Sequence, residues 1–304
     1  MKSVLAICLS PTFQKIMVFR NFHVDEVNRC VRLLEIASGK GINVTRVIND
    51  LGRPATSMAQ LGGTRTEEFL SLCRRDNIDI RFVRVPADIR TCTTIINEED
   101  HTSTELVEEA REVSPEASEE FFRLFMRELP AFDAVVISGT KASGFSADLY
   151  PRMVRECRRS GKLSVLDIKG DDLIASLKEG PSIIKPNLSE FCATFMKDVV
   201  LYENSDDGST YDRVRELARS FYEKYGTRTV ITRGKYDTWV YNGSDLAVIP
   251  SIETDLPIVN TIGCGDTLTG AMTHSLLEGN ELEKAVEFGM RCALRKATHI
   301  EQGI

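Results

Sequence analysis

Apolar and polar positions along this chain form blocks that are typical of strands followed by helices. Short runs dominated by apolar residues predict buried strands, and they fall at 3–9, 56–61, 134–138, 163–168, 182–184 and 229–232. Segments with apolar residues three or four positions apart predict helices with one buried face. These fall at 44–51, 67–75, 114–129, 148–160, 171–177, 189–195, 212–225 and 282–300. The alternation predicts an α/β fold, in which helices cover both faces of a mainly parallel sheet.

A second group of β-prone segments interrupts this alternation in the first part of the chain. Its members are 16–19, 31–36, 79–85, 91–97 and 102–107. In 79–85 and 91–97 apolar and polar residues alternate, which predicts a half-exposed antiparallel pair. We therefore expect a single α/β domain over residues 1–304, with the strands of a small β-sheet inserted at about 11–36 and 79–107.

Two local patterns complete the expected architecture. Asn242-Gly243 lies between the β-prone segments 238–241 and 246–249, which predicts a hairpin through these two residues. The polar residues at 205–210 predict a loop.

The stretch 257–278 carries the strongest local signal for a functional site. Its β-branched residues at 258–262 predict a short buried strand, and the glycine-rich turn at 263–265 leads into a helix that Asp266 opens. A helix start leaves backbone N–H groups unpaired, and the helix dipole adds partial positive charge there. Such a place suits a phosphate.

Asp266 has two interpretations at this position. A simple helix N-cap would explain a lone Gly-Asp pair. Here, however, Gly263 and Gly265 flank one residue immediately before the Asp, and a carboxylate in an anion site is unfavourable unless it has a chemical role. We therefore interpret Asp266 as a base placed beside a phosphate site.

A second glycine-rich turn lies near the N-terminus, in the run Gly39-Lys40-Gly41-Ile42-Asn43. It is not a P-loop, because Gly41 stands where that motif needs Ser or Thr. The turn could carry a solvated lysine and nothing more. Because Asn43 adds an amide within the same turn, we favour a site that holds a polar or phosphorylated ligand.

Several polar groups follow predicted strands directly. They are Ser138-Gly139, Lys185-Pro186-Asn187, Thr232-Arg233-Gly234 and the turn from Gly263 to Asp266. Ligands of open parallel sheets bind at the carboxyl ends of the strands. We therefore expect these groups to lie along one edge of the sheet.

Composition narrows the classes of function. The net charge is −7 and there is no run of Lys or Arg, which argues against nucleic acid as the main partner. No apolar run is long enough for a signal peptide or a membrane span. The eight cysteines contain no C-x-x-C pair and the four histidines show no ligand spacing, so we expect reduced thiols in a cytoplasmic protein without a zinc site.

Taken together, these motifs resemble the signatures of the PfkB carbohydrate kinases, which have the ribokinase-like fold. The resemblance rests on Gly39-Lys40-Gly41-x-Asn43, Lys185-Pro186-Asn187-x-x-Glu190, Thr232-Arg233-Gly234 and Asn260-Thr261-x-Gly263-x-Gly265-Asp266, in the family's order. It extends over the whole chain. Arg90-Thr91, Thr104-Glu105 and the run ending in Asp167-Ile168-Lys169-Gly170 are most similar to the branch of 1-phosphofructokinase and tagatose-6-phosphate kinase.

The resemblance implies transfer of the γ-phosphoryl group of ATP to a hydroxyl of a ketohexose phosphate, either fructose 1-phosphate, tagatose 6-phosphate or fructose 6-phosphate. It implies Asp266 as general base and the backbone of Gly263, Cys264 and Gly265 as anion hole. The implied ATP-binding residues are Lys185, Asn187, Glu190, Thr232 and Gly234, with Glu190 also acting near Mg²⁺. The implied sugar-binding residues are Gln14, Gly39, Lys40, Gly41, Asn43, Arg90 and Lys141. The small sheet would be a lid over the sugar that also joins two subunits into a homodimer.

Three departures from the family pattern concern the sugar side. Gln14 stands where the family has an Asp that holds sugar hydroxyls, Ser38 replaces a Gly, and Lys141-Ala142-Ser143 replaces Leu-Pro-Pro. Gln14 can still donate and accept hydrogen bonds but brings no charge. The acceptor can therefore be a different or unphosphorylated sugar or a nucleoside.

Two further alternatives belong to other classes. The departures also leave open a protein that binds a sugar phosphate without catalysis, against which the retained Asp266 argues. A dinucleotide-dependent oxidoreductase is disfavoured, because the G-x-G at 263–265 is followed by Leu268 where the third glycine would stand.

Overall fold

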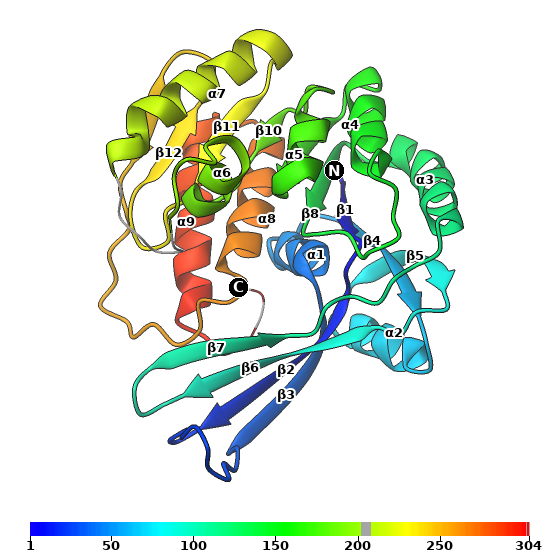
Figure 1. Cartoon of the computed structure of the whole chain (residues 1–304), viewed down its shortest axis with the longest axis vertical. Coiled ribbons are helices and arrows are strands. Elements are labelled where there is room, and N and C mark those ends of the chain that lie inside the picture. Colours follow the sequence, from blue (N-terminus) through cyan, green and yellow to red (C-terminus); the bar gives the residue numbers. More distant parts are fainter. Residues whose placement is uncertain (202–207, 302, 304) are drawn as a thin grey trace.

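The computed structural model describes residues 1–201, 208–301 and 303. Half of the predicted loop at 205–210 falls outside these residues, and its last three residues, Gly208–Thr210, form one 3₁₀ turn. Within the described residues, nine strands form a large sheet (Figure 1). They are β1 (Val4–Cys8), β4 (Ala55–Gly62), β5 (Asp79–Val85), β8 (Ala134–Ser138), β9 (Leu163–Asp167), β10 (Ile183–Ile184), β11 (Arg228–Ile231), β12 (Thr238–Tyr241) and β13 (Leu246–Ile249).

The large sheet is mainly parallel, as predicted. Its strand order is β13-β12-β11-β10-β9-β8-β1-β4-β5. All neighbours from β11 to β5 pair in parallel, whereas β12 and β13 form the predicted antiparallel hairpin at one edge. The carboxyl ends of β8, β9, β10 and β11 therefore point the same way.

Helices cover both faces of this sheet, because its central strands are apolar on both sides. In β1, Val4 and Ala6 join the core on one face and Leu5 and Ile7 join the core on the other. One face carries α1 (Lys40–Asp50), α2 (Thr66–Arg75), α8 (Cys264–Leu277) and α9 (Leu282–Ala297), and the other carries α3 (Glu116–Glu128), α4 (Leu149–Arg159), α5 (Gly170–Leu177), α6 (Leu188–Phe195) and α7 (Tyr211–Tyr225). Among the described residues, no helix has both the length and the apolar character needed to cross a bilayer.

A separate four-stranded sheet projects from one end of the molecule, at the bottom of Figure 1. Its order is β3 (Arg32–Ser38), β2 (Thr12–Phe19), β6 (Arg90–Asn97) and β7 (Thr102–Val107). The strand β2 pairs parallel with β6, and the two outer strands are antiparallel to their neighbours. We call these four strands the small sheet.

The predicted antiparallel pair of 79–85 with 91–97 is wrong. The first segment is β5, which pairs in parallel with β4 at the edge of the large sheet. The second is β6, which belongs to the small sheet. The physical reason is the β4–α2–β5 connection, a crossover that returns the chain beside the strand it left. The short link after β5 then carries the chain from one sheet to the other.

The predicted strand at 258–262 is also wrong. Ile258 is 39% exposed, so its β-branched side chain does not mark a buried strand. The N–H groups of Val259 and Asn260 both donate to the carbonyl of Ala297 at the end of α9, at 2.8 and 3.0 Å. The segment before α8 is thus an irregular strap tied to a helix end, and the turn at 263–265 does not follow a strand.

Candidate active site

The two glycine-rich turns meet at the start of α1 and α8. Both helices begin earlier than predicted, at Lys40 and Cys264, so that Asn43 and Asp266 lie in first helical turns. Asn43 Nδ2 donates to Asp266 Oδ2 at 2.8 Å, although the two residues are 223 positions apart in the chain. Asp266 is 5% exposed. The structure therefore brings the predicted base and a predicted sugar-binding residue into direct contact.

A chain of buried hydrogen bonds fixes the orientation of Asn43. Its Oδ1 accepts from Ser38 Oγ at 3.0 Å and from Arg46 Nη1 at 2.9 Å. With the carbonyl oxygen occupied by two donors, the amide NH₂ group must face Asp266. Arg46 is held in turn by Asp76, with 3.1 Å between Nη2 and Oδ2. Sequence reasoning missed Arg46, which looked like one more polar residue of a helix.

Burial and nearby charges set the acidity of Asp266. Burial raises its pKa, Lys40 opposes this, the negative charge of Asp167 adds to it, and Asn43 and Lys185 lower it again. The net result is a pKa of about 6. At neutral pH this carboxylate is mostly ionised and yet more basic than an ordinary aspartate, which suits a general base.

Asp167, at the end of β9, is the centre of a buried charge cluster. Its Oδ1 lies 3.4 Å from Lys185 Nζ and 3.9 Å from Lys40 Nζ. Its Oδ2 accepts from the hydroxyls of Ser138 and Thr269, each at 3.3 Å. Burial alone would raise the pKa of Asp167, but the two ammonium groups and these hydrogen bonds hold it below its ordinary value.

This cluster assigns different positions to the two predicted lysines. The side chain of Lys185 is 3% exposed, whereas that of Lys40 is 44% exposed. Lys185 thus lies in the protein interior, and Lys40 reaches toward the solvent-exposed side of the site. The role of Asp167 was not predicted. The signal in the sequence is a carboxylate that ends an otherwise apolar strand.

Close packing explains the glycines around Lys40. A Cβ on Gly41 would lie 2.3 Å from the carbonyl oxygen of Ile7 in β1. Gly39 has φ of 123° and a Cβ there would lie 2.6 Å from Cys8 Sγ. Both positions must lack a side chain for α1 to start against β1. Lys40 is therefore the one residue of the three that can present a side chain to a ligand.

The turn at the start of α8 has the geometry of an anion site only in part. Gly263 adopts φ of 89° and its carbonyl already accepts from Thr267 N at 2.9 Å. Cys264 N donates to the carbonyl of Thr261 at 3.2 Å. Of the three predicted anion-hole residues, Cys264 would have to release this bond to bind an anion. Gly265 lies in the first turn, where N–H groups lack a partner within the helix.

Four of the predicted nucleotide-binding residues lie together at the ends of β10 and β11. Asn187 and Glu190 form a capping box at the start of α6, in which each side chain accepts from the other's backbone N–H, at 2.8 and 3.1 Å. Asn187 also forms a parallel bridge with Thr232. Gly234 follows with φ of 63°. These contacts place the predicted residues side by side and give them a structural role as well.

The carboxylate of Glu190 fits a cation bound through water. One oxygen serves the capping box, while the other lies 3.6 Å from Lys169 Nζ. No group of three or more metal-ligating side chains occurs in the described part of the chain. Mg²⁺ usually keeps several waters and takes only one or two protein carboxylates. Glu190 would therefore suit an outer position near such a metal, if one binds here.

Two predicted sugar-binding residues lie on the small sheet. Gln14 is buried, and its Nε2 donates to Thr94 Oγ1 at 2.9 Å. Arg90 donates to the carbonyls of Glu108 at 2.7 Å and Ser10 at 3.4 Å. Its buried Nε has no partner among the described residues. A Cβ on Gly39 would lie 3.2 Å from that Ser10 carbonyl oxygen, so Arg90 lies next to the turn that carries Lys40.

Lys141 is not available in the way predicted. Its Nζ lies 2.5 Å from Asp172 Oδ1 and 3.1 Å from the carbonyl of Ser146, and the side chain is only 9% exposed. To bind a phosphate it would have to leave this ion pair. The structure does not bring it to Asp266.

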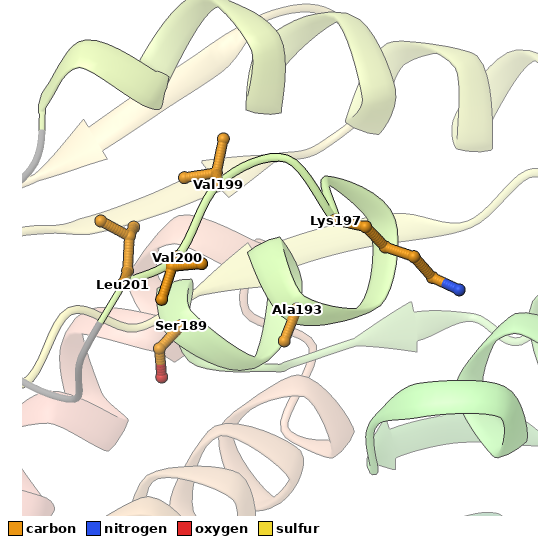
Figure 2. A pocket seen from close by; sticks show the side chains of 6 residues that line it. All are labelled: Ser189, Ala193, Lys197, Val199, Val200 and Leu201. Atoms are coloured by element: carbon orange, nitrogen blue, oxygen red, sulfur yellow. The ribbon is translucent and has the colours of Figure 1, made fainter.

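Two surface hollows lie away from this cluster. One, of about 290 Å³, is formed by α6 and the segment after it, and Figure 2 shows its largely apolar lining by Ser189, Ala193, Lys197, Val199, Val200 and Leu201. The other, of about 520 Å³, lies between β6 and the C-terminal segment, with Asn97, His101 and His299 among its lining residues. Neither includes Asp266 or Lys40. The candidate site is therefore identified by the contacts among its side chains and not by either of these hollows.

Comparison with known proteins gives a consistent assignment. Residues 11–301 match the family described as pfkB family carbohydrate kinase. The tagatose-6-phosphate kinase of Staphylococcus epidermidis is 26% identical over 306 residues, which cover 97% of this chain and 93% of that protein.

Solved structures of similar fold cover nearly the whole chain. A possible 1-phosphofructokinase from Thermotoga maritima is 23% identical, with a TM-score of 0.85, covering 99% of this chain and 93% of that one. Phosphofructokinase-2 from Escherichia coli, in complex with fructose-6-phosphate, is 22% identical with a TM-score of 0.81, covering 96% and 93%. These likenesses show the predicted ribokinase-like fold.

Proposed function

Because this chain belongs to the pfkB family of carbohydrate kinases, we propose that it transfers the γ-phosphoryl group of ATP to a hydroxyl of a ketohexose phosphate. Fructose 1-phosphate, tagatose 6-phosphate and fructose 6-phosphate are the proposed acceptors. The observation that carries the proposal is the 2.8 Å contact between Asn43 and Asp266, which joins the two glycine-rich turns in one buried site. The names of the relatives support a phosphorylated acceptor.

In the proposed reaction Asp266 acts as general base. The oxygen of the acceptor hydroxyl forms a bond to the γ-phosphorus as the bond from that phosphorus to the ADP oxygen breaks, and the hydroxyl proton passes to the Asp266 carboxylate. The bond from Asn43 occupies one oxygen of Asp266 and thereby directs the other toward the acceptor. General-base catalysis of this kind typically contributes about 10²–10⁴-fold to the rate.

The phosphates carry negative charge, which positive groups of this chain would offset. Lys40 is half-exposed beside the site, and the amide of Gly265 lies at the positive end of α8. Asn187, Thr232 and Gly234 would line the nucleotide, with Lys185 fixed behind them by Asp167. Mg²⁺, when bound, would neutralise phosphate charge, and Glu190 would orient its water ligands.

The acceptor would bind between α1 and the small sheet. Gly39, Lys40 and Gly41 would approach the sugar through backbone and ammonium, and Gln14 would hydrogen-bond its hydroxyls. We propose that Arg90 contacts the existing phosphate, because its buried Nε has no partner among the described residues and guanidinium groups suit phosphate. The small sheet would then close as a lid and exclude water, which otherwise accepts the phosphoryl group.

An ADP-release assay tests this proposal directly. The acceptor panel contains the three ketohexose phosphates, free hexoses and nucleosides, each with and without magnesium. We expect turnover with at least one ketohexose phosphate and a loss of about 10³-fold or more in Asp266→Asn. Turnover of free sugars or nucleosides alone would show that the acceptor is not a ketohexose phosphate.

A binding protein is the alternative that this assay must separate. If the wild type turns over nothing while Asp266→Asn binds sugar phosphate as well as the wild type does, catalysis is excluded. Arg90→Ala is expected to raise KM for phosphorylated acceptors strongly and to leave KM for ATP near the wild-type value. An unchanged KM for the acceptor would remove Arg90 from the phosphate site.

A further inference from the structure

A lysine near the end of α9 is buried without a charged partner. Lys296 is 0% exposed, and its Nζ donates to the carbonyl of Asn260 at 3.1 Å. Among the described residues, no carboxylate lies within ion-pair distance of it. An ammonium group loses much solvation free energy on burial, so a lysine here is unfavourable unless its charge serves a purpose. The mechanism above does not use this residue.

The ammonium group lies directly behind the turn that opens α8. Asn260 accepts from Lys296 through its carbonyl, while its side chain spans the strap with bonds to Ile262 N at 3.0 Å and to the carbonyl of Ile300 at 2.9 Å. On the same side of α9, the Sγ of Cys264 lies 3.4 Å from the carbonyl of Ala293. Lys296 thus reaches from α9 to the segment that continues into Gly263 and Cys264.

The electrostatics agree with this placement. Burial lowers the pKa of Lys296, the neighbouring Cys264 and Asp266 raise it in part, and the net value is about 8. The group therefore carries its charge at neutral pH. A charge enclosed in protein acts over several ångströms with little screening, unlike a charge at the surface.

We propose that the ammonium group of Lys296 is a built-in cation of the phosphoryl-transfer site, which positions the segment 260–264 and adds positive charge behind the anion hole. The inference rests on the function proposed above. Lys296 is a positioning residue, because it acts through the backbone of the turn. It implies that the enzyme needs no dissolved monovalent cation, since the charge is attached to the chain.

A purely structural role gives a different expectation. If Lys296 only fills space between α8 and α9, an apolar side chain of similar length would replace it. Methionine has nearly the same shape without the charge and the donor. Lys296→Met therefore separates charge from packing, and Lys296→Ala leaves room for a small cation from solution.

The test measures kcat and KM of both variants in the ADP-release assay, in choline buffer with or without ammonium, methylammonium or potassium chloride. We expect Lys296→Met and Lys296→Ala to lower kcat about 10²-fold, the size of effect that one oxyanion-stabilising group has. Ammonium or methylammonium is expected to restore at least about tenfold to Lys296→Ala but nothing to Lys296→Met. The wild type is expected to respond to none of the cations.

The neighbouring exposed residue provides the matched control. Arg295→Met removes one positive charge from the same helical turn at the surface, and its kcat is expected to stay at the wild-type value. Wild-type kcat in Lys296→Met would overturn the inference, as would a folded Lys296→Ala that no cation rescues. Thermal unfolding of each variant establishes that it is folded. Turnover by the wild type decides the proposed function separately, before the variants are compared.

Discussion

At the scale of single residues, the site depends on two buried carboxylates whose pKa values are shifted in opposite directions. Asp266 receives one hydrogen bond from a neutral amide, and its pKa is raised to about 6. Asp167 receives two ammonium groups and two hydroxyls, and its pKa is lowered. When the environments of two carboxylates push their pKa values apart, one of them commonly acts as a proton acceptor and the other stays permanently charged. Three predictions follow from this difference.

The first concerns the pH dependence of turnover. Only the ionised form of Asp266 can accept the proton of the acceptor hydroxyl. Since its pKa is about 6, we expect kcat/KM to fall as the pH drops through 6, by about tenfold per pH unit at the acid end. The measurement is a pH–rate profile from pH 5 to 8. A profile that stays flat down to pH 5 would rule out Asp266 as the base.

The second concerns stability. Because the pKa of Asp266 is higher in the folded than in the unfolded state, folding favours the proton, and the ionised group lowers stability above pH 6. Asp266→Asn should therefore be more stable than the wild type at pH 8, by about 1–3 kcal/mol. The difference should shrink below pH 4, where the carboxyl is protonated in both states. Urea unfolding at both pH values measures it, and a less stable variant at pH 8 contradicts the assignment.

The third prediction concerns Asp167, whose pKa is shifted in the opposite direction to that of Asp266. Its lowered pKa contributes stability that is present above pH 4 and is lost as the pH falls through the folded value. Asp167→Asn leaves Lys185 buried without its counter-charge, which typically costs about 3–5 kcal/mol. Adding Lys185→Met to that variant should recover part of the loss. A double variant that is less stable than Asp167→Asn would contradict this pairing.

At the scale of elements, the contact between α1 and α8 holds the site together. Gly270 makes this contact possible: a Cβ there would lie 3.1 Å from the carbonyl oxygen of Val44 and 3.1 Å from Val47 Cγ1. Each helix carries one partner of the Asn43–Asp266 bond in its first turn. A small separation of the two helices is therefore expected to alter that bond.

Gly270→Ala tests this dependence. Overpacking of this kind typically costs about 1–3 kcal/mol, offset in part by the better helix propensity of Ala. We expect lower stability together with a kcat reduced about tenfold, a loss of the size that misplaced catalytic groups cause. Gly289→Ala is the matched control, because its Cβ would meet Leu268 O at 2.9 Å in the contact between α8 and α9. A loss of kcat as large in the control would show that helix packing in general, and not the α1–α8 contact, is responsible.

At the scale of the whole molecule, the small sheet leaves apolar side chains uncovered. Leu33 on β3 is 56% exposed and Leu106 on β7 is 54% exposed. Exposed apolar patches on a projecting sheet are typical of an interface with another chain. We keep the prediction that two copies of this chain associate through the small sheet.

This prediction can be measured as a mass in solution. We expect about 68 kDa, twice the 34.0 kDa of one chain, by light scattering. The double variant Leu33→Asp/Leu106→Asp should fall to the mass of one chain, because charges cannot be buried unpaired at the interface. Val248→Asp, at a residue 48% exposed on the edge strand β13, is the control and should keep the wild-type mass. A wild type of single-chain mass at micromolar concentration would contradict the dimer.

The sequence by itself determined most elements and the chemical character of the site. Apolar runs and helical spacing are local patterns, so the strands β1, β8 and β9 and the helices α4 and α5 appear close to where they were predicted. The glycine-rich turns were visible for the same reason, since a residue such as Gly41 is required by its own immediate packing. The kinase family, too, could be predicted from these motifs.

Only the tertiary structure decided how these parts meet. The segment 79–85 joined the large sheet because a crossover through α2 returned it there, and the strap at 257–262 bonded to the end of α9 instead of forming a strand. The bond from Asn43 to Asp266 and the burial of Lys296 depend on α1, α8 and α9 packing together. Contacts between residues far apart in the chain arise from the packing of whole elements, which no local pattern of residues encodes.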